Sequence, residues 1–580
     1  MSALKIGLVV DGERLTKQTH DLVQWARSTG DIQVTHLIVQ QRPARARRPL
    51  WAKILRKSPA ELTALLLWRL KDHIEQRQVE ALQAYRDSNA TFAVDATVPG
   101  RIFVNPLVSP SGFVHRFGEG DLERIRQERF DLLLRCGSGI LRGDILAAAR
   151  LGILSFHHGD NRINRGGPPG FWEVYHGWSK TGFVVQRLTE ELDGGDVILR
   201  GFVPTQRSHL LNCALLYEKS WFHLRALLQR IAAAGALPQP EPHVPYASRL
   251  YVAPSARQLA RYLLKRAARS LAGRVRQALE HKERWGVCYL KCDWPNAALW
   301  RGRRIATPPG RFLADPFVAT RGGRTCLFVE NYVYRTGKAH ISVFELEEPG
   351  PKELGIAVEE DFHLSFPFLF EHDGSLFMCP ESSAARQIRI YRCVGFPLEW
   401  RLECVAMRDV SAVDCMIFCH EGLWWLLANL SYAPPVEQRT ELHLFRAADP
   451  LSGEWEPHRR NPVLIDPEFA RNGGLLRTDG GLVRVCQSEG FGSYGAAANL
   501  MRITRLDLDH YTEEAICRIT PGFLPGINGT HHMHSDGIYS VWDYKRWERV
   551  RPARRRPAAR GGITLGPICL PGAGPTQAAG

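Results

Sequence analysis

A turn dipeptide followed by an apolar strand recurs five times in the C-terminal half of the chain. Each turn dipeptide ends in a glycine. These glycines are at positions 323, 374, 422, 480 and 537, so successive copies are about 50 to 58 residues apart. A glycine in a tight hairpin supplies the positive φ that the turn requires. A period near 50 with several strands per unit is typical of propeller blades. We therefore expect an all-β five-bladed propeller over 290–547, because a β-sandwich would not explain five evenly spaced copies.

The N-terminal part shows a different pattern, in which strand-like and helix-like segments alternate. Apolar runs at 4–11, 34–39, 131–135 and 153–156 predict strands, and periodic segments at 18–29, 60–86, 121–127, 143–150 and 210–235 predict helices. Such alternation predicts a Rossmann-type α/β domain with a parallel sheet over residues 1–235. Ligands of these sheets bind at the carboxyl ends of the strands. The chemistry is therefore expected just after the strand 153–156.

The segment between these patterns is expected to connect them. Its first part is rich in proline, and residues 255–284 predict a basic helix with apolar side chains at Leu259, Tyr262, Leu263 and Leu271. We expect this helix to pack on one of the domains, or alternatively to lie on an anionic membrane surface. The predicted organisation is a domain at 1–235, a linker and basic helix at 236–289, a propeller at 290–547 and a disordered basic tail at 548–580.

Charge and cysteine usage narrow the class of protein. The net charge is +15, and much of it lies in the basic helix, in the tail and in a cluster near residues 42–57. These charges indicate solvated surface or attraction to anionic lipid or glycan. Nucleic acid is not expected as a partner, because no aromatic-interleaved basic motif accompanies the charge. The thirteen cysteines are scattered singly and the first residues read as a strand rather than a signal peptide, so we expect a cytoplasmic location.

Five short elements follow one another within residues 152–198. They are His157 at the end of a strand, Arg165-Gly166 with Pro169, Gly177, Thr181-Gly182, and Leu192-Asp193-Gly194-Gly195-Asp196. This order resembles the catalytic core of the folate-dependent formyltransferases. The resemblance implies a formyl-transfer reaction in which an acceptor amine attacks the formyl group of 10-formyltetrahydrofolate.

The same resemblance implies roles for three catalytic residues. His157 would take the proton of the amine or stabilise the oxyanion, and Asp193 would orient and support the imidazole. Ser155 stands where the family has an asparagine, and a hydroxyl donates only one hydrogen bond. Three alternatives follow: Ser155 or His158 replaces the amide donor, the reaction is altered, or the domain binds without catalysing.

The resemblance also implies where the donor and the acceptor bind. The backbone of two loops would hold the folate, at Gly137, Gly139, Ile140 and Leu141, and at Leu192, Gly194 and Asp196. Arg162 and Arg165, beside Gly166, would bind a phosphate of the acceptor, although a structural role is an equal alternative.

Polar residues in the predicted propeller are expected to line one central funnel. These are Asp315, Glu381, Asp414 and His532. The phrases ADPF and CPES around the first two resemble the five-bladed propellers of certain glycoside hydrolases and the N-terminal-like domain of glucosamine inositolphosphorylceramide transferases. Paired carboxylates there could act as acid and base on a glycosidic bond, or alternatively Asp315 and Asp414 cap turns. No metal is expected, because alternation along a strand places only His532 and His534 on one face.

The two resemblances share carbohydrate as a common ligand. The first hypothesis is therefore an N-formyltransferase that formylates an amine of a sugar, nucleotide-sugar or glycan while the propeller binds carbohydrate. The second is that the propeller is a glycoside hydrolase or glycosyltransferase and the N-terminal domain is degenerate. The third is a non-enzymatic module that binds glycan or makes peripheral contact with an anionic membrane.

Overall fold

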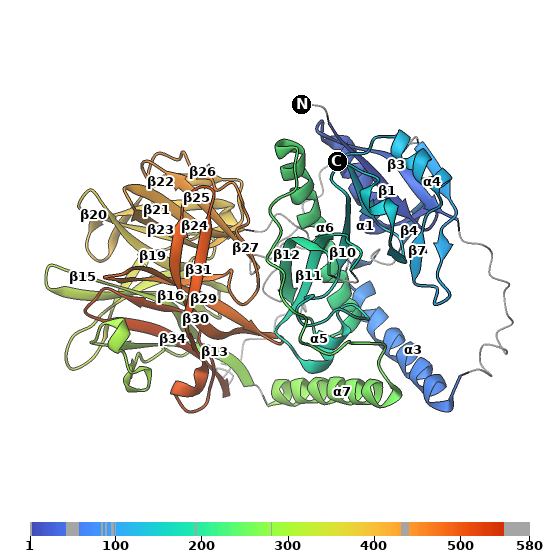
Figure 1. The fold of residues 1–580 in the computed structure, drawn as a ribbon. Helices are drawn as coiled ribbons and strands as arrows, with labels where there is room; N and C mark the ends of the chain where they lie inside the picture. Colours follow the sequence, from blue (N-terminus) through green and yellow to red (C-terminus); the bar gives the residue numbers. More distant parts are fainter. Residues whose placement is uncertain are drawn as a thin grey trace, which may run out of the picture.

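The computed structural model describes residues 3–41, 57–82, 85–86, 90–93, 98, 100–191, 194–279, 281–430 and 440–549. In Figure 1 an α/β region formed by the first part of the chain lies beside a region built from strands. Leu192 and Asp193 lie outside the described residues, as do most of the basic cluster near residues 42–57 and all but the first two residues of the predicted tail.

The N-terminal region is built on a seven-stranded mixed sheet in the order β12-β11-β10-β8-β1-β3-β5. Its strands are β1 (Leu4–Val10), β3 (Ile32–Gln40), β5 (Gly100–Val104), β8 (Leu132–Arg135), β10 (Ile153–His157), β11 (Lys180–Arg187) and β12 (Asp196–Pro204). The first five of these pair in parallel, as predicted. The prediction of a purely parallel sheet is wrong at one edge, because β11 returns antiparallel to β10 and forms a hairpin with β12.

The helices of this region are α1 (Lys17–Ser28), α3 (Pro59–Glu80), α4 (Glu119–Gln127), α5 (Phe171–His176), α6 (His209–Ala234) and α7 (Ala256–Ala278), with a 3-10 turn η2 (Asp144–Ala147). Of these, α1, α4 and α6 contact strands of the sheet, whereas α3 contacts α6 and α7. Smaller strands are β2 (Arg14–Thr16), which pairs with β4 (Thr91–Ala93), and β6 (Leu107–Val108), β7 (Val114–Arg116) and β9 (Ile140–Leu141). The apolar side of α6 packs on the strands with Leu224, Leu227, Leu228 and Ile231.

Two predicted helices are shorter in the structure. Residues 143–150 form only the single turn η2. The basic helix predicted to reach residue 284 ends at Ala278, and residues from His281 onward belong to a strand. The physical reason in the second case is long-range pairing, since this strand is matched residue by residue with the last strand of the chain and that pairing overrides the local helical pattern.

Within the described part of the C-terminal region the strands form five antiparallel sheets. One sheet joins both ends of this region and contains β13 (His281–Leu290), β14 (Arg303–Arg304), β32 (Ile527–Gly529), β33 (Met533–Ser535) and β34 (Ser540–Arg549). The next two sheets contain β15 (Arg311–Arg321), β16 (Arg324–Val333), β17 (Lys338–Glu345) and β18 (Lys352–Val358), and then β19 (Ser365–His372), β20 (Ser375–Glu381), β21 (Gln387–Gly395) and β22 (Glu399–Arg408). The last two contain β23 (Ala412–His420), β24 (Leu423–Leu430), β25 (Glu441–Ala447), β26 (Glu456–Pro457) and β27 (Leu464–Ile465), and then β28 (Asn472–Thr478), β29 (Gly481–Gly490), β30 (Ser493–Leu506) and β31 (Tyr511–Ile519).

The inner strands of these sheets contact one another in a closed cycle. β15 contacts β19, β19 contacts β23, β23 contacts β28, β28 contacts β33, and β33 contacts β15. The turn glycines that the repeat predicts have positive φ in four hairpins, at Gly323, Gly374, Gly422 and Gly537, and in the remaining hairpin this conformation falls on Gly481. The repeat in the sequence therefore corresponds to one hairpin in each sheet.

Polar contacts join the two regions. Lys180 on β11 forms an ion pair with Asp466, 2.6 Å from Nζ to the carboxylate. Glu441 on β25 lies between Lys219 and His223 of α6, at 3.6 Å from each, and all three side chains are buried. Among the described residues, no helix has the length and hydrophobicity needed to cross a bilayer.

Candidate functional site

His157 lies where the sequence places it, at the carboxyl end of β10. Its Nε2 is 2.6 Å from the carbonyl oxygen of Asn164, so the ring is tied to the loop that follows the strand. The hydroxyl of Ser155 is buried and accepts a hydrogen bond from Arg135 Nη1 at 3.2 Å. The described residues thus bring His157 and Ser155 to one strand end, while the predicted third member, Asp193, lies outside them.

His158 is packed between β10 and α6. Its ring stacks on Phe156 with centroids 4.9 Å apart, contacts Tyr217, and has Nε2 3.2 Å from the hydroxyl of Ser220. Burial, and secondarily the neighbouring His157, lowers the pKa of His158 to about 3. A neutral imidazole enclosed in this way is part of the packing against α6, which disfavours the alternative that His158 replaces the missing amide donor.

The loop expected to hold the folate is tightly built. Asp11 accepts hydrogen bonds from the backbone and the hydroxyl of Ser138, at 2.8 and 2.6 Å. A Cβ on Gly137 would lie 2.9 Å from Asp11, and one on Gly139, which has φ +88°, would lie 2.4 Å from His115. Position 139 therefore requires glycine, and a side chain at 137 would displace the Asp11 carboxylate. Ile140 and Leu141, which follow, form β9.

Residues 241–251, here named the strap, run across the loop 160–167 expected to bind the acceptor. Arg162 pairs with Glu241 at 3.0 Å, and the Arg165 guanidinium lies 4.7 Å from the centre of the Tyr246 ring. A Cβ on Gly166 would stand 1.7 Å from the carbonyl oxygen of Tyr251. Residues of the strap therefore contact the two arginine side chains predicted to hold an acceptor phosphate.

The other edge of the predicted donor site is also engaged. Asp196 forms ion pairs with Arg187 and, at 3.0 Å, with His243 of the strap. Gly194 lies against Glu191, because a Cβ there would stand 2.8 Å from that carboxylate. These contacts give Asp196 and Gly194 structural partners within the chain.

The C-terminal region brings its predicted carboxylates to equivalent positions of successive sheets. Asp315 and Asp414 occupy β-bulges of the inner strands β15 and β23, with φ of +48° and +51°. Phe366 has φ +45° at the corresponding bulge of β19. Non-glycine residues in this conformation cost of order 1–3 kcal/mol each and cluster at functional sites. One strand further out, Glu330 pairs with Ala314 and Glu381 pairs with Ser365, so these two carboxylates are also equivalent.

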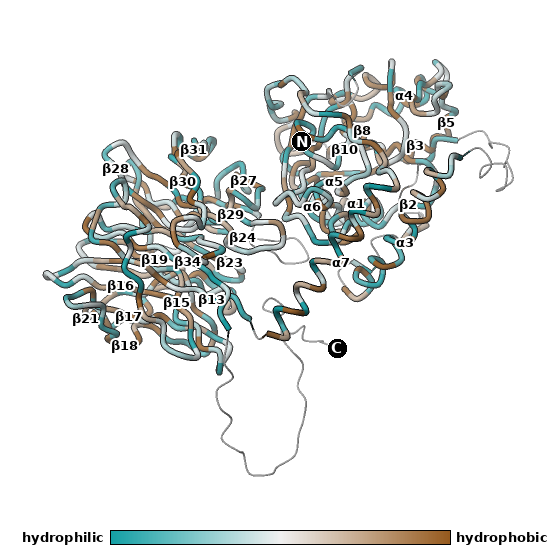
Figure 2. Tube along the Cα trace, turned by 90° about the horizontal axis from the view of Figure 1, so that it is seen from below, coloured by the Kyte–Doolittle hydropathy of each residue, from teal (hydrophilic) through white to brown (hydrophobic). Residues whose placement is uncertain are grey.

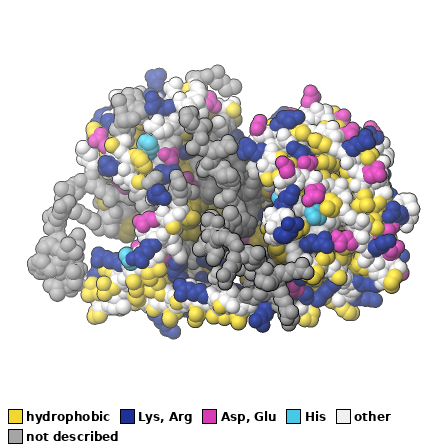
Figure 3. Space-filling model, turned by 180° about the vertical axis from the view of Figure 1, so that it is seen from behind, with side chains coloured by type: hydrophobic (Ala, Val, Ile, Leu, Met, Phe, Trp, Pro, Cys, Tyr) yellow, Lys and Arg dark blue, Asp and Glu magenta, His cyan; other side chains and the backbone are white. Residues whose placement is uncertain are grey.

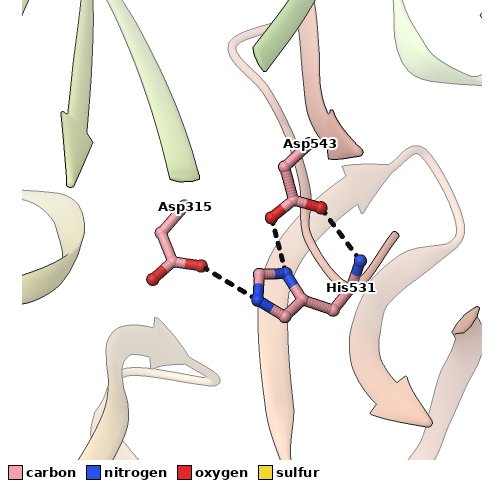
Figure 4. Close-up of side chains that lie close together, drawn as sticks. All are labelled: Asp315, His531 and Asp543. Atoms are coloured by element: carbon pink, nitrogen blue, oxygen red, sulfur yellow. Dashed lines mark hydrogen bonds and ion pairs between the residues drawn. The ribbon is translucent and has the colours of Figure 1, made fainter. Parts of the chain in front are cut away.

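An aspartate–histidine–aspartate chain lies at the centre of this region (Figure 4). Nδ1 of His531 is 2.5 Å from Asp543, and its Nε2 is 3.9 Å from Asp315. The backbone N–H groups of His531 and His532 both donate to the other oxygen of Asp543. Burial alone would lower the pKa of His531, but the Asp543 carboxylate raises it, and the imidazolium in turn lowers the pKa of Asp543 against the effect of burial.

A second ion pair lies beside this chain. Arg471 Nε donates to Asp414, and Gln487 Nε2 donates to the same carboxylate oxygen at 3.1 Å. The Arg471 guanidinium also lies 5.0 Å from the centre of the Tyr494 ring, which contacts the His531 ring at 5.2 Å. Desolvation alone would lower the pKa of Arg471, but Asp414 and Tyr494 raise it. Asp414 is therefore in contact with a buried cation.

The remaining carboxylates are destabilised in their charged form. Burial, with repulsion from Asp414, raises the pKa of Asp315 to about 7 even though His531 opposes the shift. Burial and Asp414 likewise raise the pKa of Glu381 to about 7. The pKa of Glu330 is raised well above its usual range by burial and by Asp315. The cluster thus combines carboxyls that are protonated near neutral pH with one that is paired to an arginine.

His532 lies elsewhere than the predicted funnel. Its Nε2 is 2.8 Å from the carbonyl oxygen of Pro316, its ring packs on Phe317, and burial lowers its pKa to about 3. His531 occupies the place beside Asp315. The alternation argument missed this because β33 begins only at Met533, so the two residues before it do not follow strand alternation. Arg471, Tyr494 and Asp543 were also missed, because no spacing rule connects them to Asp315 or Asp414.

The chain offers one three-residue donor group for a metal among the residues that the structure describes. Ligand atoms of Asp315, His531 and Asp543 all lie within 4.8 Å of one another. Two ligands of a tetrahedral zinc ion, each at about 2.0–2.1 Å, lie roughly 3.3 Å apart. The 2.5 Å separation of His531 Nδ1 and Asp543 is shorter, so in this structure the two groups are in direct contact as an ion pair.

Comparison with known proteins matches the C-terminal region to one family. Residues 300–521 match the family model described as glucosamine inositolphosphorylceramide transferase 1, N-terminal. The rice glucosamine inositolphosphorylceramide transferase 1 is 36% identical over 210 residues, which cover 35% of this chain and 28% of the rice protein. The chain thus spans less than a third of the length of that relative.

The N-terminal region is similar to a different protein. Methionyl-tRNA formyltransferase of Bacillus subtilis is 25% identical over 224 residues, which cover 36% of this chain and 67% of that protein. Among solved structures, a family 117 glycoside hydrolase from Zobellia galactanivorans aligns with 41% of this chain and 76% of its own, with a TM-score of 0.30 and 11% identity.

Proposed function

We propose that the C-terminal region is a five-bladed β-propeller whose central carboxylates act on a glycosidic bond, and that this chain is a glycosyl-transferring enzyme. The observation that carries the proposal is that two carboxyls at equivalent bulges have different surroundings. Asp315 has its pKa raised to about 7, and Asp414 is ion-paired with Arg471. Two carboxyls whose environments differ in this way are what acid–base chemistry at neutral pH requires.

The roles follow from these environments. Asp315, protonated near neutral pH, would donate its proton to the oxygen that leaves the sugar, which lowers the barrier to breaking the bond. Asp414 would stabilise the positive charge that develops on the sugar ring as the bond lengthens. The acceptor hydroxyl would attack the anomeric carbon and give its proton to the Asp315 carboxylate, which restores the acid. His531, fixed by Asp543, faces Asp315 through Nε2 and would stabilise that carboxylate while it is ionised.

The substrate class rests on the relatives. Rice glucosamine inositolphosphorylceramide transferase 1 bears in its name an amino sugar and a lipid with an inositolphosphoryl headgroup. We infer for this chain a sugar substrate of the same kind, with the hydroxyl of an inositol-type headgroup as acceptor. A cytoplasmic location and the division into domains at 235, 289 and 547 belong to the same proposal.

Replacing the two aspartates tests the proposal. We expect Asp315→Asn and Asp414→Asn each to reduce transfer of the sugar from an alkyl glucosaminide, whose leaving oxygen needs a proton, to inositol by about 10²–10⁴-fold. Asp373→Asn is the matched control, because Asp373 has the same backbone conformation in an exposed hairpin turn and should retain full turnover. Full turnover in both site variants would refute a catalytic role for this cluster.

Formyl transfer from 10-formyltetrahydrofolate to a sugar amine is a second candidate function. The similarity to methionyl-tRNA formyltransferase and the glycine-built loop 137–141 favour it. The engaged hydroxyl of Ser155 and the strap across Arg162 and Arg165 place it second. A thermal-shift titration with a folate analogue decides, since ligand at about 100 times its Kd should stabilise a live site by roughly 2.7 kcal/mol.

A further inference from the structure

Helix α7 has two apolar faces, and the residues that the structure describes cover only one of them. Leu259 and Tyr262 point into the protein and pack against Phe171 of α5. Leu264, Leu271 and Val275 are 71%, 64% and 48% exposed. Helical periodicity places these three side chains within a narrow stripe on the side opposite Leu259 and Tyr262. A helix in a water-exposed position would carry polar residues on this stripe.

Helix α3 repeats the pattern beside α7. The two helices are in contact, and Glu75 of α3 accepts a hydrogen bond from Tyr262 and lies 3.8 Å from Arg266. On its outer side α3 carries Leu66 and Leu70, which are 67% and 48% exposed. Figure 2 shows hydrophobic and hydrophilic positions following one another along both helices. Among the described residues, exposed apolar side chains therefore lie on the outer sides of both helices.

The charges on the α7 part of this surface have one sign. α7 contains seven basic residues and no acidic residue, whereas α3 carries charges of both signs. Arg257, Arg261 and Arg274 are exposed, and helical periodicity sets them within or beside the outer stripe. Figure 3 shows hydrophobic side chains along the lower edge of the molecule with Lys and Arg side chains next to them. Exposed leucines flanked by arginines match a partner that is apolar inside and anionic at its surface.

We propose that the outer faces of α3 and α7 dock on the surface of a bilayer that contains anionic lipids. The helices would lie parallel to the bilayer, with Leu264, Leu271 and Leu66 at the boundary between headgroups and acyl chains. The flanking arginines would meet the lipid phosphates, each adding about fivefold to the affinity. A second copy of the chain is a poorer partner, because pairing two α7 helices would bring like charges together. A nucleic acid would leave the leucines exposed.

Vesicle co-sedimentation of the full chain tests this surface. We expect wild-type protein to bind vesicles of phosphatidylcholine with 30% phosphatidylserine, and to bind vesicles of phosphatidylcholine alone at least tenfold more weakly. Leu264→Glu with Leu271→Glu should weaken binding to the anionic vesicles at least tenfold. Leu402→Glu is the matched control, because Leu402 is 47% exposed on β22, in the other region of the molecule, and should bind as wild type.

Further measurements separate this docking surface from its alternatives. Arg257→Gln with Arg261→Gln removes charge without touching the leucines, and we expect it to weaken binding and to reduce its salt dependence. Circular dichroism of each variant shows whether the fold is retained. Equal binding by the leucine variant and wild type would overturn the proposal, as would the absence of binding to anionic vesicles. A wild-type dimer that the leucine variant converts to monomer, without vesicle binding, would assign the face to a second copy instead.

Discussion

The two regions differ in the contacts that the rest of the chain makes with their candidate site residues. In the N-terminal region Ser155, Arg162 and Arg165 are already bound by other parts of the same chain. In the C-terminal region Asp315 and His531 face each other, and the buried carboxyls around them have raised pKa values. The first set of contacts lowers the energy of the protein as it stands. The second leaves groups whose charge is poorly stabilised until a substrate or a proton arrives.

This difference separates the evidence for a fold from the evidence for a working site. The N-terminal region is similar to a formyltransferase, yet its candidate side chains Ser155, Arg162 and Arg165 have partners within the chain. The C-terminal region shows strained bulges and mutually repelling carboxyls, which stability alone does not favour. Residues whose backbone conformation or charge lowers stability are expected at functional sites, and here such residues lie in the C-terminal cluster.

The prediction with the largest expected effect tests whether the two regions stabilise each other. Glu441→Ala removes the buried carboxylate that contacts Lys219 and His223 across the interface. Breaking a buried ionic group typically costs about 3–5 kcal/mol. We expect denaturant unfolding to show a loss of this size, with the two regions unfolding in separate transitions. The exposed Glu454→Ala should change the free energy of unfolding little, and an equal loss there would show that the effect is not specific to the interface.

The pH dependence tests the C-terminal half of the comparison. Because the pKa of Asp315 is raised to about 7, the folded protein keeps a proton that the unfolded chain has released above pH about 4. The unfolding free energy should therefore fall as pH rises from about 4 to 7, and this contribution should be constant above that range.

Turnover should follow the same group. If Asp315 is the acid, the rate should fall about tenfold per pH unit above pH 7, as the proton is lost. The matched variant is Asp315→Asn, in which the stability change between pH 4 and 7 should be smaller than in wild type. A stability profile identical in both proteins would mean that Asp315 does not titrate in this window.

The smallest effect concerns the N-terminal half. Gly166→Ala places a Cβ where the Tyr251 carbonyl now lies, and we expect it to displace the strap at a cost of about 1–3 kcal/mol. Thermal unfolding with and without a folate analogue measures both consequences. Gly30→Ala is the control, since a Cβ there meets nothing within 4 Å. Saturable folate binding by wild type would show that the strap does not close this site, and would make the two regions alike.

The sequence predicts the strands and turns that local patterns determine. Apolar runs located β1, β8 and β10, and the repeated turns located a hairpin in each of the five sheets. It could not reach contacts that depend on distant pairing. Asp543 meets His531 because β34 folds back on β33, and Arg471 reaches Asp414 from 57 residues away. The proline-rich composition of 236–254 indicates a linker, but nothing in it specifies that Glu241 and Tyr251 lie along the loop 160–167.

The pairing of β13 with β34 has a consequence for how the protein is made. These strands match His281 with Arg549 and Leu290 with Ser540, so the sheet that closes the cycle joins segments about 250 residues apart. Contacts of such long sequence separation form slowly. During synthesis the early strand must therefore wait, with its edge open, until nearly all the remaining strands have left the ribosome. Chaperones that bind exposed strand edges are expected to matter most for this protein in that interval, and far less once the last strand is in place.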